Sequence, residues 1–289
     1  MSFNNKILVL SIIVLIGIPF AVGIVGYQKY QEKEEAKKNA LKPREEINVT
    51  IIPGWTLRQV ASDWVKKGFL KKESEVYEIL GEPARKYGGL GNNAPDLTVK
   101  FPEISILKEK EENSSYEGFI FPDTYRVYKD AKPEELLKKI FDNLEQKITA
   151  EMRAEMKKQG KSFFEILTMA SIVEKEAPDA TSMAKVADIF WRRLNMNWAL
   201  QSCATVNYIT GKTTPAVSLE ETKIDSPYNT YKYRGLPPGP ISNPSLTAIK
   251  AVIYPEKNDY WYFLSDNEGN IYYSKTLEQH NAYKARYLK

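Results

Sequence analysis

The sequence predicts an α+β fold with an N-terminal transmembrane helix, and three observations support this prediction. The chain has 289 residues, 43% of them apolar and 27% charged, which suits one large or two modest folded domains. An uncharged apolar run occupies residues 7–28. After it, apolar residues at helical spacing alternate with short aromatic stretches that predict strands. We expect an anchor in residues 1–29, a linker in 30–46, a small α+β subdomain in 47–107 and a larger mixed α/β domain in 108–289.

The uncharged run from Ile7 to Gln28 is long enough to cross a bilayer, for which about 20 apolar residues suffice. A cleaved signal peptide is the alternative, because the small residues Ala21 to Gly23 loosely resemble a cleavage site. We expect a retained anchor, since the apolar run continues past that point. More lysines follow the run than precede it, so the positive-inside rule alone would keep the C-terminal part in the cytoplasm.

The segment after the anchor is charged and lacks a wide apolar face, which is typical of a linker. From Ile47 the pattern predicts a strand, a Pro-Gly turn and a helix that ends at Gly68. A second short helix is expected after Ser74. These elements make up the small α+β subdomain.

The larger domain is expected to contain several helices and a few strands. Its first stretch, Tyr116 to Tyr128, is extended and aromatic and is broken at Pro122. The segment from Ser226 to Ser245 is rich in proline, glycine and asparagine, and structureless segments of such length are commonly functional. Two strands around a turn are expected in residues 260–274. Helices are expected from Pro133 onward, in residues 162–177, about 182–194 and 245–253, and around His280.

The apolar helix pattern "SFFEILTMASIVEKEA" has a readable start and end. Ser162 and Glu165 have capping-box spacing, in which each side chain binds a free backbone N–H, and Pro178 cannot continue the helix. At about 100° per residue, Glu174 lies within the apolar stripe, whereas Glu176 lies on the opposite, solvated face. A carboxylate shielded from water keeps its proton more readily, as a general acid must. Glu174 is therefore a candidate catalytic acid; fraying of the helix end or pairing with a lysine or arginine would give it a structural role instead.

The composition excludes several kinds of site. One cysteine, Cys203, and one histidine, His280, exclude an intrachain disulfide and leave too few ligands for a common zinc site. A Ser-His-Asp triad would need His280, which we expect in a C-terminal helix. The net charge is +4 without a long basic block, so we expect no nucleic-acid partner. We also expect no metal and no cofactor, and we expect any chemistry to use carboxylates.

Five stretches between Glu117 and Asn281 carry a family resemblance: "EGFIFPDTY", "ASIVEKEA", "RLNMNWALQSCATVNY", "SPYNTY" with "GLPPGPISNPS", and "DYWYFLSDNEGN" with "EQHN". In this order they resemble the endolytic murein transglycosylases of the MltG (YceG-like) family. The segment from Ile47 to about Leu70 looks like that family's LysM-like subdomain, which makes residues 108–289 the expected catalytic domain. The first glutamate of the "VEKE" stretch is catalytic in the family, and it corresponds to Glu174 here.

The resemblance implies a membrane-anchored enzyme that cleaves the MurNAc–GlcNAc β-1,4 bond of peptidoglycan and leaves 1,6-anhydro-MurNAc ends. Glu174 would act first as general acid and then as base for the MurNAc 6-hydroxyl. Most glycosidases need two carboxylates, but an intramolecular hydroxyl is already present at high effective concentration. The implied partners are peptidoglycan glycan strands and the cytoplasmic membrane, with peptidoglycan synthases as further candidates. The part from Ile47 onward would then lie outside the inner cell membrane, on a single-pass anchor whose short N-terminal tail lies in the cytoplasm.

The candidate substrate-binding residues carry amides, hydroxyls or a carboxylate. Such groups match the donors and acceptors of N-acetyl sugars, and loop stabilisation is the alternative role for each. For the carboxylate, a groove-wall or structural role is expected rather than catalysis. The candidates are Glu117, Gln201, Ser202, Tyr228, Asn229 and Thr230.

Two rival functions remain open. A hydrolytic muramidase would need a second carboxylate, such as Glu117 or Asp123, near Glu174. A non-catalytic cell-wall glycan-binding scaffold would have no need to turn an acid toward the core. The chain departs from the family's usual pattern at Cys203-Ala204, where the family commonly has Asp-Pro, so the shape of the substrate subsites is open.

Overall fold

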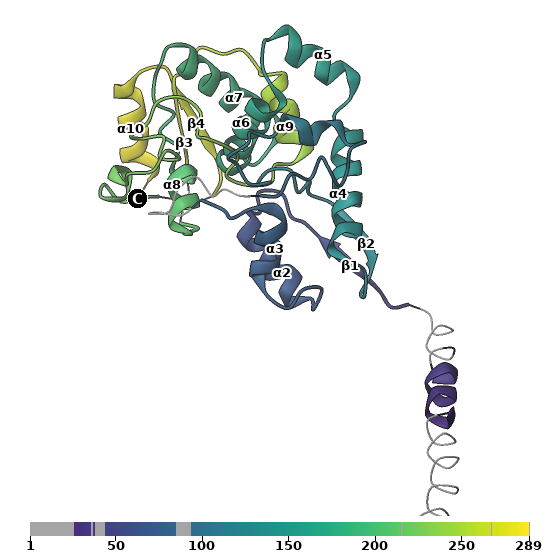
Figure 1. The fold of residues 1–289 in the computed structure, drawn as a ribbon. Coiled ribbons are helices and arrows are strands. Elements are labelled where there is room, and N and C mark those ends of the chain that lie inside the picture. The colour runs from purple at the N-terminus through teal and green to yellow at the C-terminus, as the bar shows by residue number, and fades with distance from the viewer. Residues whose placement is uncertain are drawn as a thin grey trace, which may run out of the picture. The chain divides into compact units, whose positions relative to one another are not determined.

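The computed structural model describes residues 26–35, 37, 44–84, 94–214, 216–266 and 268–288, and its contacts divide the chain into the units Met1–Glu45 and Glu46–Lys289 (Figure 1). In the first unit, residues 26–35 form an exposed helix. The predicted transmembrane segment lies outside the described residues as far as residue 25. Within the parts of the chain that are described, no helix is long and apolar enough to cross a membrane. The transmembrane anchor therefore stays a prediction.

The second unit begins with a two-stranded antiparallel sheet. β1 (Glu46–Thr50) pairs with β2 (Thr124–Tyr128), and the chain between them forms α2 (Leu57–Lys66), α3 (Glu73–Leu80) and the 3₁₀ turn η1 (Ser105–Glu109). The predicted strand, turn, helix and second short helix are thus confirmed. Because β2 belongs to the predicted larger domain, this sheet joins the two segments on either side of residue 107. The LysM-like assignment of the first segment stays a prediction.

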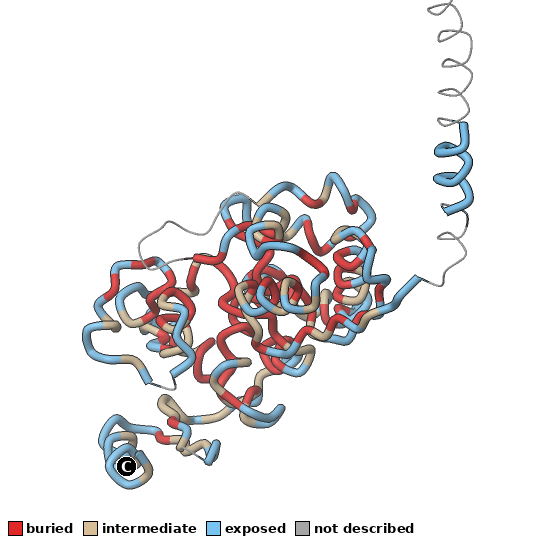
Figure 2. Tube along the Cα trace, turned by 90° about the horizontal axis from the view of Figure 1, so that it is seen from below, coloured by how far each residue is buried: buried red, intermediate tan, exposed pale blue. Residues whose placement is uncertain are grey.

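Helix α6 (Phe163–Glu176) lies at the centre of the helical part of this unit. It packs against α5 (Ala150–Lys158), α7 (Ala180–Asn195), α8 (Cys203–Thr210) and α9 (Leu246–Ile253), and Figure 1 shows α7 and α9 beside it. All its residues from Ile166 to Val173 are buried, and Figure 2 shows the buried chain gathered in the middle of the unit. The prediction of a single apolar stripe is therefore wrong, because neighbouring helices cover α6 on several sides.

The ends of α6 are where the sequence predicts them. Ser162 Oγ accepts a hydrogen bond from the Glu165 N–H at 3.1 Å, and Glu165 Oε2 accepts one from the Ser162 N–H at 2.8 Å. This is the capping box, which satisfies two free donors of the first turn. Ala177 is extended, as expected for a residue before proline. Glu174 consequently lies in the last turn of the helix.

The remaining elements surround this core. α4 (Pro133–Lys147) begins at its predicted proline and packs against β2. β3 (Tyr262–Ser265) and β4 (Ile271–Ser274) form a second antiparallel pair, and α10 (Leu277–Tyr287) packs against both strands. These elements confirm the predicted pair of strands in residues 260–274 and the predicted helix around His280. Helices α7 and α9 confirm the helices predicted in residues 182–194 and 245–253. The sequence did not predict α5, α8 or the 3₁₀ turn η2 (Glu221–Lys223).

Candidate active site

Glu174 in the last turn of α6 is held by the start of α9. Its Oε2 atom accepts hydrogen bonds from the Ser245 backbone N–H at 2.9 Å and from the Ser245 hydroxyl at 2.6 Å. The N-terminal end of a helix carries a partial positive charge, which favours an anion there. Within the described part of the chain, Oε1 of Glu174 has no hydrogen-bond partner. The side chain is partly buried, so one oxygen is oriented by the protein while the other is unengaged.

Glu176 does not lie on a solvated face, so that prediction is wrong. Its Oε1 atom accepts a hydrogen bond from the Ser202 hydroxyl, and the Arg193 guanidinium acts on it electrostatically. Burial raises the pKa of the Glu176 carboxyl, while the hydrogen bond from Ser202 and the charge of Arg193 oppose the rise. Glu176 is shielded by tertiary contacts: residues from α7 and from the start of α8 cover the side of α6 that helical spacing predicts to be exposed.

Glu117 is buried inside the protein rather than placed along a groove. Only 1% of its surface is exposed, and the Leu57 N–H donates to both carboxylate oxygens, at 2.9 and 3.1 Å. Asn243 Nδ2 donates to Oε1 at 3.3 Å. Burial raises the pKa of this carboxyl to about 8, against the effect of the Leu57 hydrogen bond and the nearby Arg58. This placement fits the structural role and not a direct contact with sugar.

The segment 236–245, which we call the Pro-rich strap, runs along α6 toward Glu174. Ile241 N–H donates to Ser171 Oγ at 2.9 Å, and Ser242 Oγ donates to the Ser171 carbonyl at 3.0 Å. Further along, Ser245 reaches Glu174. The strap therefore runs parallel to α6, and both segments end near Glu174.

Asn243 fastens the strap to two other segments. Its Oδ1 accepts from the Ile120 N–H at 2.9 Å, and its Nδ2 donates to the Trp55 carbonyl at 2.9 Å. Its backbone carbonyl accepts from the Gly54 N–H at 2.8 Å. A Cβ atom built on Gly54 would lie 3.5 Å from Cγ of Glu174, so this turn lies directly beside the acid. The site is thus assembled from α6, the strap and the turn before α2.

The other candidate substrate-binding residues fall into two groups. Gln201 is exposed and has a left-handed backbone with φ of 55°, and Ser202 beside it is bound to Glu176. Tyr228, Asn229 and Thr230 are buried, which fits the alternative of loop stabilisation.

Within the buried group, the side chains of Asn229 and Thr230 form hydrogen bonds to other parts of the protein. Asn229 Nδ2 donates to two carbonyls, those of Thr222 and Ile224, at 3.0 and 2.8 Å. Thr230 Oγ1 lies 2.9 Å from Thr205 Oγ1 and also accepts from the Ser202 N–H at 3.1 Å. These residues hold the chain that precedes α8 against the chain that precedes the strap.

Sequence reasoning missed Ser245 and Asn243 as residues of the site. Ser245 was predicted only as the start of a helix, and its hydroxyl does accept from the Ala248 N–H at 3.1 Å as the N-cap of α9. The same hydroxyl also reaches Glu174, which is 71 residues away in the chain. No local signal reports a contact of that kind. Within the described residues, no cluster of three or more His, Cys, Asp or Glu side chains could hold a metal ion.

The fold and the site define an α+β protein in which the last turn of a central helix carries the partly buried Glu174 carboxylate. The YceG-like family model matches residues 27–286, so the chain belongs to the YceG-like family. A crystal structure of a putative YceG-like protein from Listeria monocytogenes is similar, with a TM-score of 0.67 and 32% identity. The match covers 87% of this chain and 79% of that one.

Two curated relatives are each named endolytic murein transglycosylase. The one from Bacillus subtilis (strain 168) is 39% identical over 84% of this chain. The one from Streptococcus pneumoniae (strain D39) is 32% identical over 89% of this chain. The matched part spans 65% of the first relative's length and 48% of the second's.

Proposed function

We propose that this protein is an endolytic lytic transglycosylase of peptidoglycan, which cuts the MurNAc–GlcNAc β-1,4 bond inside glycan strands. One observation carries the proposal: Glu174, at the family's catalytic position, has Oε2 bound by Ser245 and Oε1 without a partner in the described chain. The names of the relatives from Bacillus subtilis and Streptococcus pneumoniae support the same class of reaction.

The reaction needs one group that first gives and then takes a proton. Protonated Glu174 donates to the glycosidic oxygen, the C1–O bond breaks, and GlcNAc leaves with an ordinary hydroxyl. The MurNAc 6-hydroxyl attacks C1 and passes its proton to Glu174, which closes the 1,6-anhydro ring and restores the acid. No water is consumed. The two hydrogen bonds from Ser245 fix Oε2, so the proton transfers fall to Oε1.

The neighbouring carboxylates of Glu117 and Glu176 are the groups to weigh as a second catalytic residue. Glu117 is bound by Leu57 and Asn243, and Glu176 is bound by Ser202. A hydrolytic muramidase would need a second carboxylate beside a water molecule or the sugar. Both oxygens of Glu117 are bound, which favours the intramolecular route, whereas Glu176 Oε2 has no hydrogen-bond partner in the described chain.

We further propose that the N-terminus stays uncleaved as a single-pass anchor and that the catalytic domain faces the cell wall, where it trims or terminates nascent strands. The uncharged run from Ile7 to Gln28 motivates this part. Intact-mass measurement of protein extracted from membranes checks it, and a mature chain that starts near Ile24 would refute it.

The test of the reaction is the chemistry of the product ends. Full-length protein in detergent is incubated with purified peptidoglycan, and early products are measured by mass spectrometry before and after borohydride treatment. Anhydro ends resist reduction and are one water lighter than hydrolysed ends. Long fragments early in the digestion would show cutting within strands. Reducible MurNAc ends as the main product would instead identify a muramidase.

A further inference from the structure

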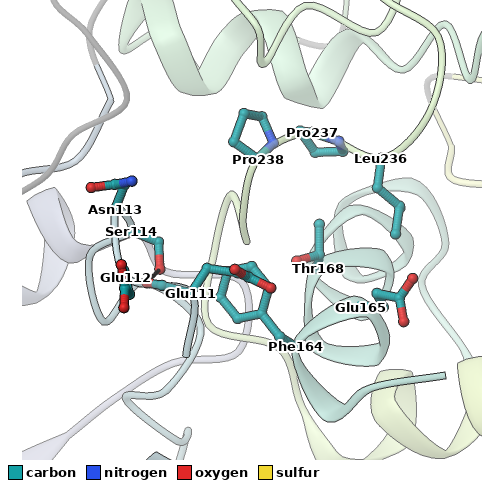
Figure 3. A pocket seen from close by; sticks show the side chains of 10 residues that line it. All are labelled: Glu111, Glu112, Asn113, Ser114, Phe164, Glu165, Thr168, Leu236, Pro237 and Pro238. Atoms are coloured by element: carbon teal, nitrogen blue, oxygen red, sulfur yellow. Dashed lines mark hydrogen bonds between the residues drawn. The ribbon is translucent and has the colours of Figure 1, made fainter. Parts of the chain in front are cut away.

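A pocket of about 500 Å³ lies beside the first half of α6, away from Glu174 (Figure 3). Three segments form its walls: the loop of residues 111–114, the helix face with Phe164 and Thr168, and the beginning of the Pro-rich strap. Figure 3 shows the two strap prolines above the helix face and the acidic loop across from it. None of the steps proposed above uses this pocket.

Thr168 in the wall of the pocket has an unused hydroxyl. The residue is only 1% exposed, and its Oγ1 atom lacks a hydrogen-bond partner among the described residues. In Figure 3 this hydroxyl lies on the pocket side of the helix. One turn later, Ser171 uses its hydroxyl fully, donating to the Thr168 carbonyl at 2.7 Å and accepting from Ile241. A buried polar group without a partner is costly, so an unpaired one in a pocket wall points to a ligand.

Three carboxylates stand around the same pocket: Glu111, Glu112 and Glu165, all on exposed residues. None of them forms an ion pair within 4.0 Å with another described residue. Lys110 does interact electrostatically with Glu111 and Glu112. Lys161 interacts in the same way with Glu165. Lys110 Nζ donates to the carbonyls of Glu111 and Ser114 in the pocket loop. Lys161 Nζ lies over the Trp191 ring. The pocket therefore offers carboxylate acceptors that no described lysine or arginine contacts directly.

The walls between these polar groups are apolar. Phe164, Leu236, Pro237 and Pro238 supply a ring, an aliphatic side chain and two rigid pyrrolidine rings. An aliphatic chain that ends in a primary ammonium group matches this combination, because the chain contacts the apolar wall and the three N–H donors meet carboxylates and a hydroxyl. In peptidoglycan, such a chain is the side chain of the diamino acid in a stem peptide.

The pocket and the candidate acid are joined by the same two segments. From Thr168 to Glu174 the helix advances six residues, a rise of about 9 Å. The Pro-rich strap begins at the pocket wall and ends at Ser245 on Glu174. Since the stem peptide is attached to MurNAc, a glycan cut at Glu174 could place its own stem in the pocket.

We propose that this pocket binds the side-chain ammonium group of a stem-peptide diamino acid on the strand being cut, and so selects strands with a free amine. This inference rests on the proposed function and adds a subsite to it. The substrate would be recognised through its peptide as well as through its sugars.

The test compares native peptidoglycan with peptidoglycan whose free amines have been acetylated. With full-length wild-type protein, we expect acetylation to lower kcat/KM about 10-fold or more, as for loss of hydrogen bonds to charged groups. The double variant E111Q/E112Q should cut both substrates at similar, low efficiency. Glu165 is left unchanged because it also completes the capping box of α6. The matched control is Glu220→Gln, an exposed acid paired with Lys223 outside the pocket, which should keep the preference.

A second variant separates ligand binding from folding. Thr168→Val keeps the shape of the side chain and removes the unpaired hydroxyl. We expect the preference for native substrate to fall while the unfolding temperature stays equal or rises, because a buried unsatisfied group is lost. A structural role for the hydroxyl would lower the unfolding temperature instead.

The two proposals fail in different ways. Equal cutting of both substrates by wild-type protein, together with loss of cutting in Glu174→Gln, would overturn the pocket inference and leave the function standing. Normal cutting by Glu174→Gln would overturn the function. In that case, equilibrium binding of native and acetylated stem peptides to the full-length protein decides the pocket, and equal binding would refute it.

Discussion

The hydroxyl of Ser245 makes two hydrogen bonds, one that stabilises a helix and one that orients the candidate acid. The hydroxyl caps α9 through the Ala248 N–H and also donates to Glu174 Oε2 at 2.6 Å. Ser245→Ala removes both hydrogen bonds. Loss of an N-cap costs about 1 kcal/mol of stability. Loss of a hydrogen bond to a charged group costs about 1.5–3 kcal/mol, or roughly 10- to 150-fold if it is expressed in the rate.

The lower end of that range is expected, because the Ser245 backbone N–H still holds Oε2 at 2.9 Å. We therefore predict about a 10-fold fall in kcat for Ser245→Ala and a fall in unfolding free energy of about 1 kcal/mol. The assays are initial rates of anhydro-end formation and urea unfolding. Ser245→Thr keeps a hydroxyl and should keep most of the rate.

The matched control is a helix cap that does not touch the site. Thr276 caps α10 by accepting from the Gln279 N–H at 3.2 Å. Thr276→Ala should lose stability on the same scale and keep the wild-type rate. If Ser245→Ala also kept the wild-type rate, the hydroxyl would only cap α9, and the reasoning that it orients Glu174 would be refuted.

Three further predictions concern other residues. Glu174→Gln should lower the rate by about 10²–10⁴-fold with the fold intact. Glu176→Gln should keep most activity, because burial already favours the neutral form of that side chain. An inactive Glu176→Gln variant beside an active Glu174→Gln variant would show that Glu176 is the catalytic acid. Because burial raises the pKa of Glu117 to about 8, the folded state holds this proton more tightly than the unfolded chain. The free energy of unfolding should therefore fall as pH rises from about 4.3 toward 8, by at most about 1.4 kcal/mol per pH unit, and Glu117→Gln should remove this contribution in urea titrations at several pH values. Gly118→Ala should destabilise by about 2 kcal/mol or more, since its φ is +88° and an added Cβ would lie 2.7 Å from a proline of the strap. Gly235→Ala, with positive φ but open space around it, should cost less in the same unfolding measurement.

The local elements near the site were predictable from the sequence because their causes are local. The capping box of Ser162 and Glu165 and the proline at position 178 determine where α6 begins and ends. The same is true of the start of α4 and of the two strands around the turn in residues 260–274. Helical geometry and the family motif together singled out Glu174, whose catalytic role remains a proposal.

The surroundings of the acids depended on contacts that no local pattern encodes. The prediction from an apolar stripe holds only for a helix that is covered on one face. Helix α6 is packed by other helices on several sides. Helical spacing therefore wrongly predicted that Glu176 is exposed to solvent. Burial of that carboxyl comes from Ser202 and Arg193, which approach from other elements. The sequence by itself determined the boundaries of α6 and the position of Glu174 in its last turn. Only the tertiary structure decided that Ser245 binds Glu174 and that Glu117 is buried against α2, because both contacts join residues at least 60 positions apart in the chain.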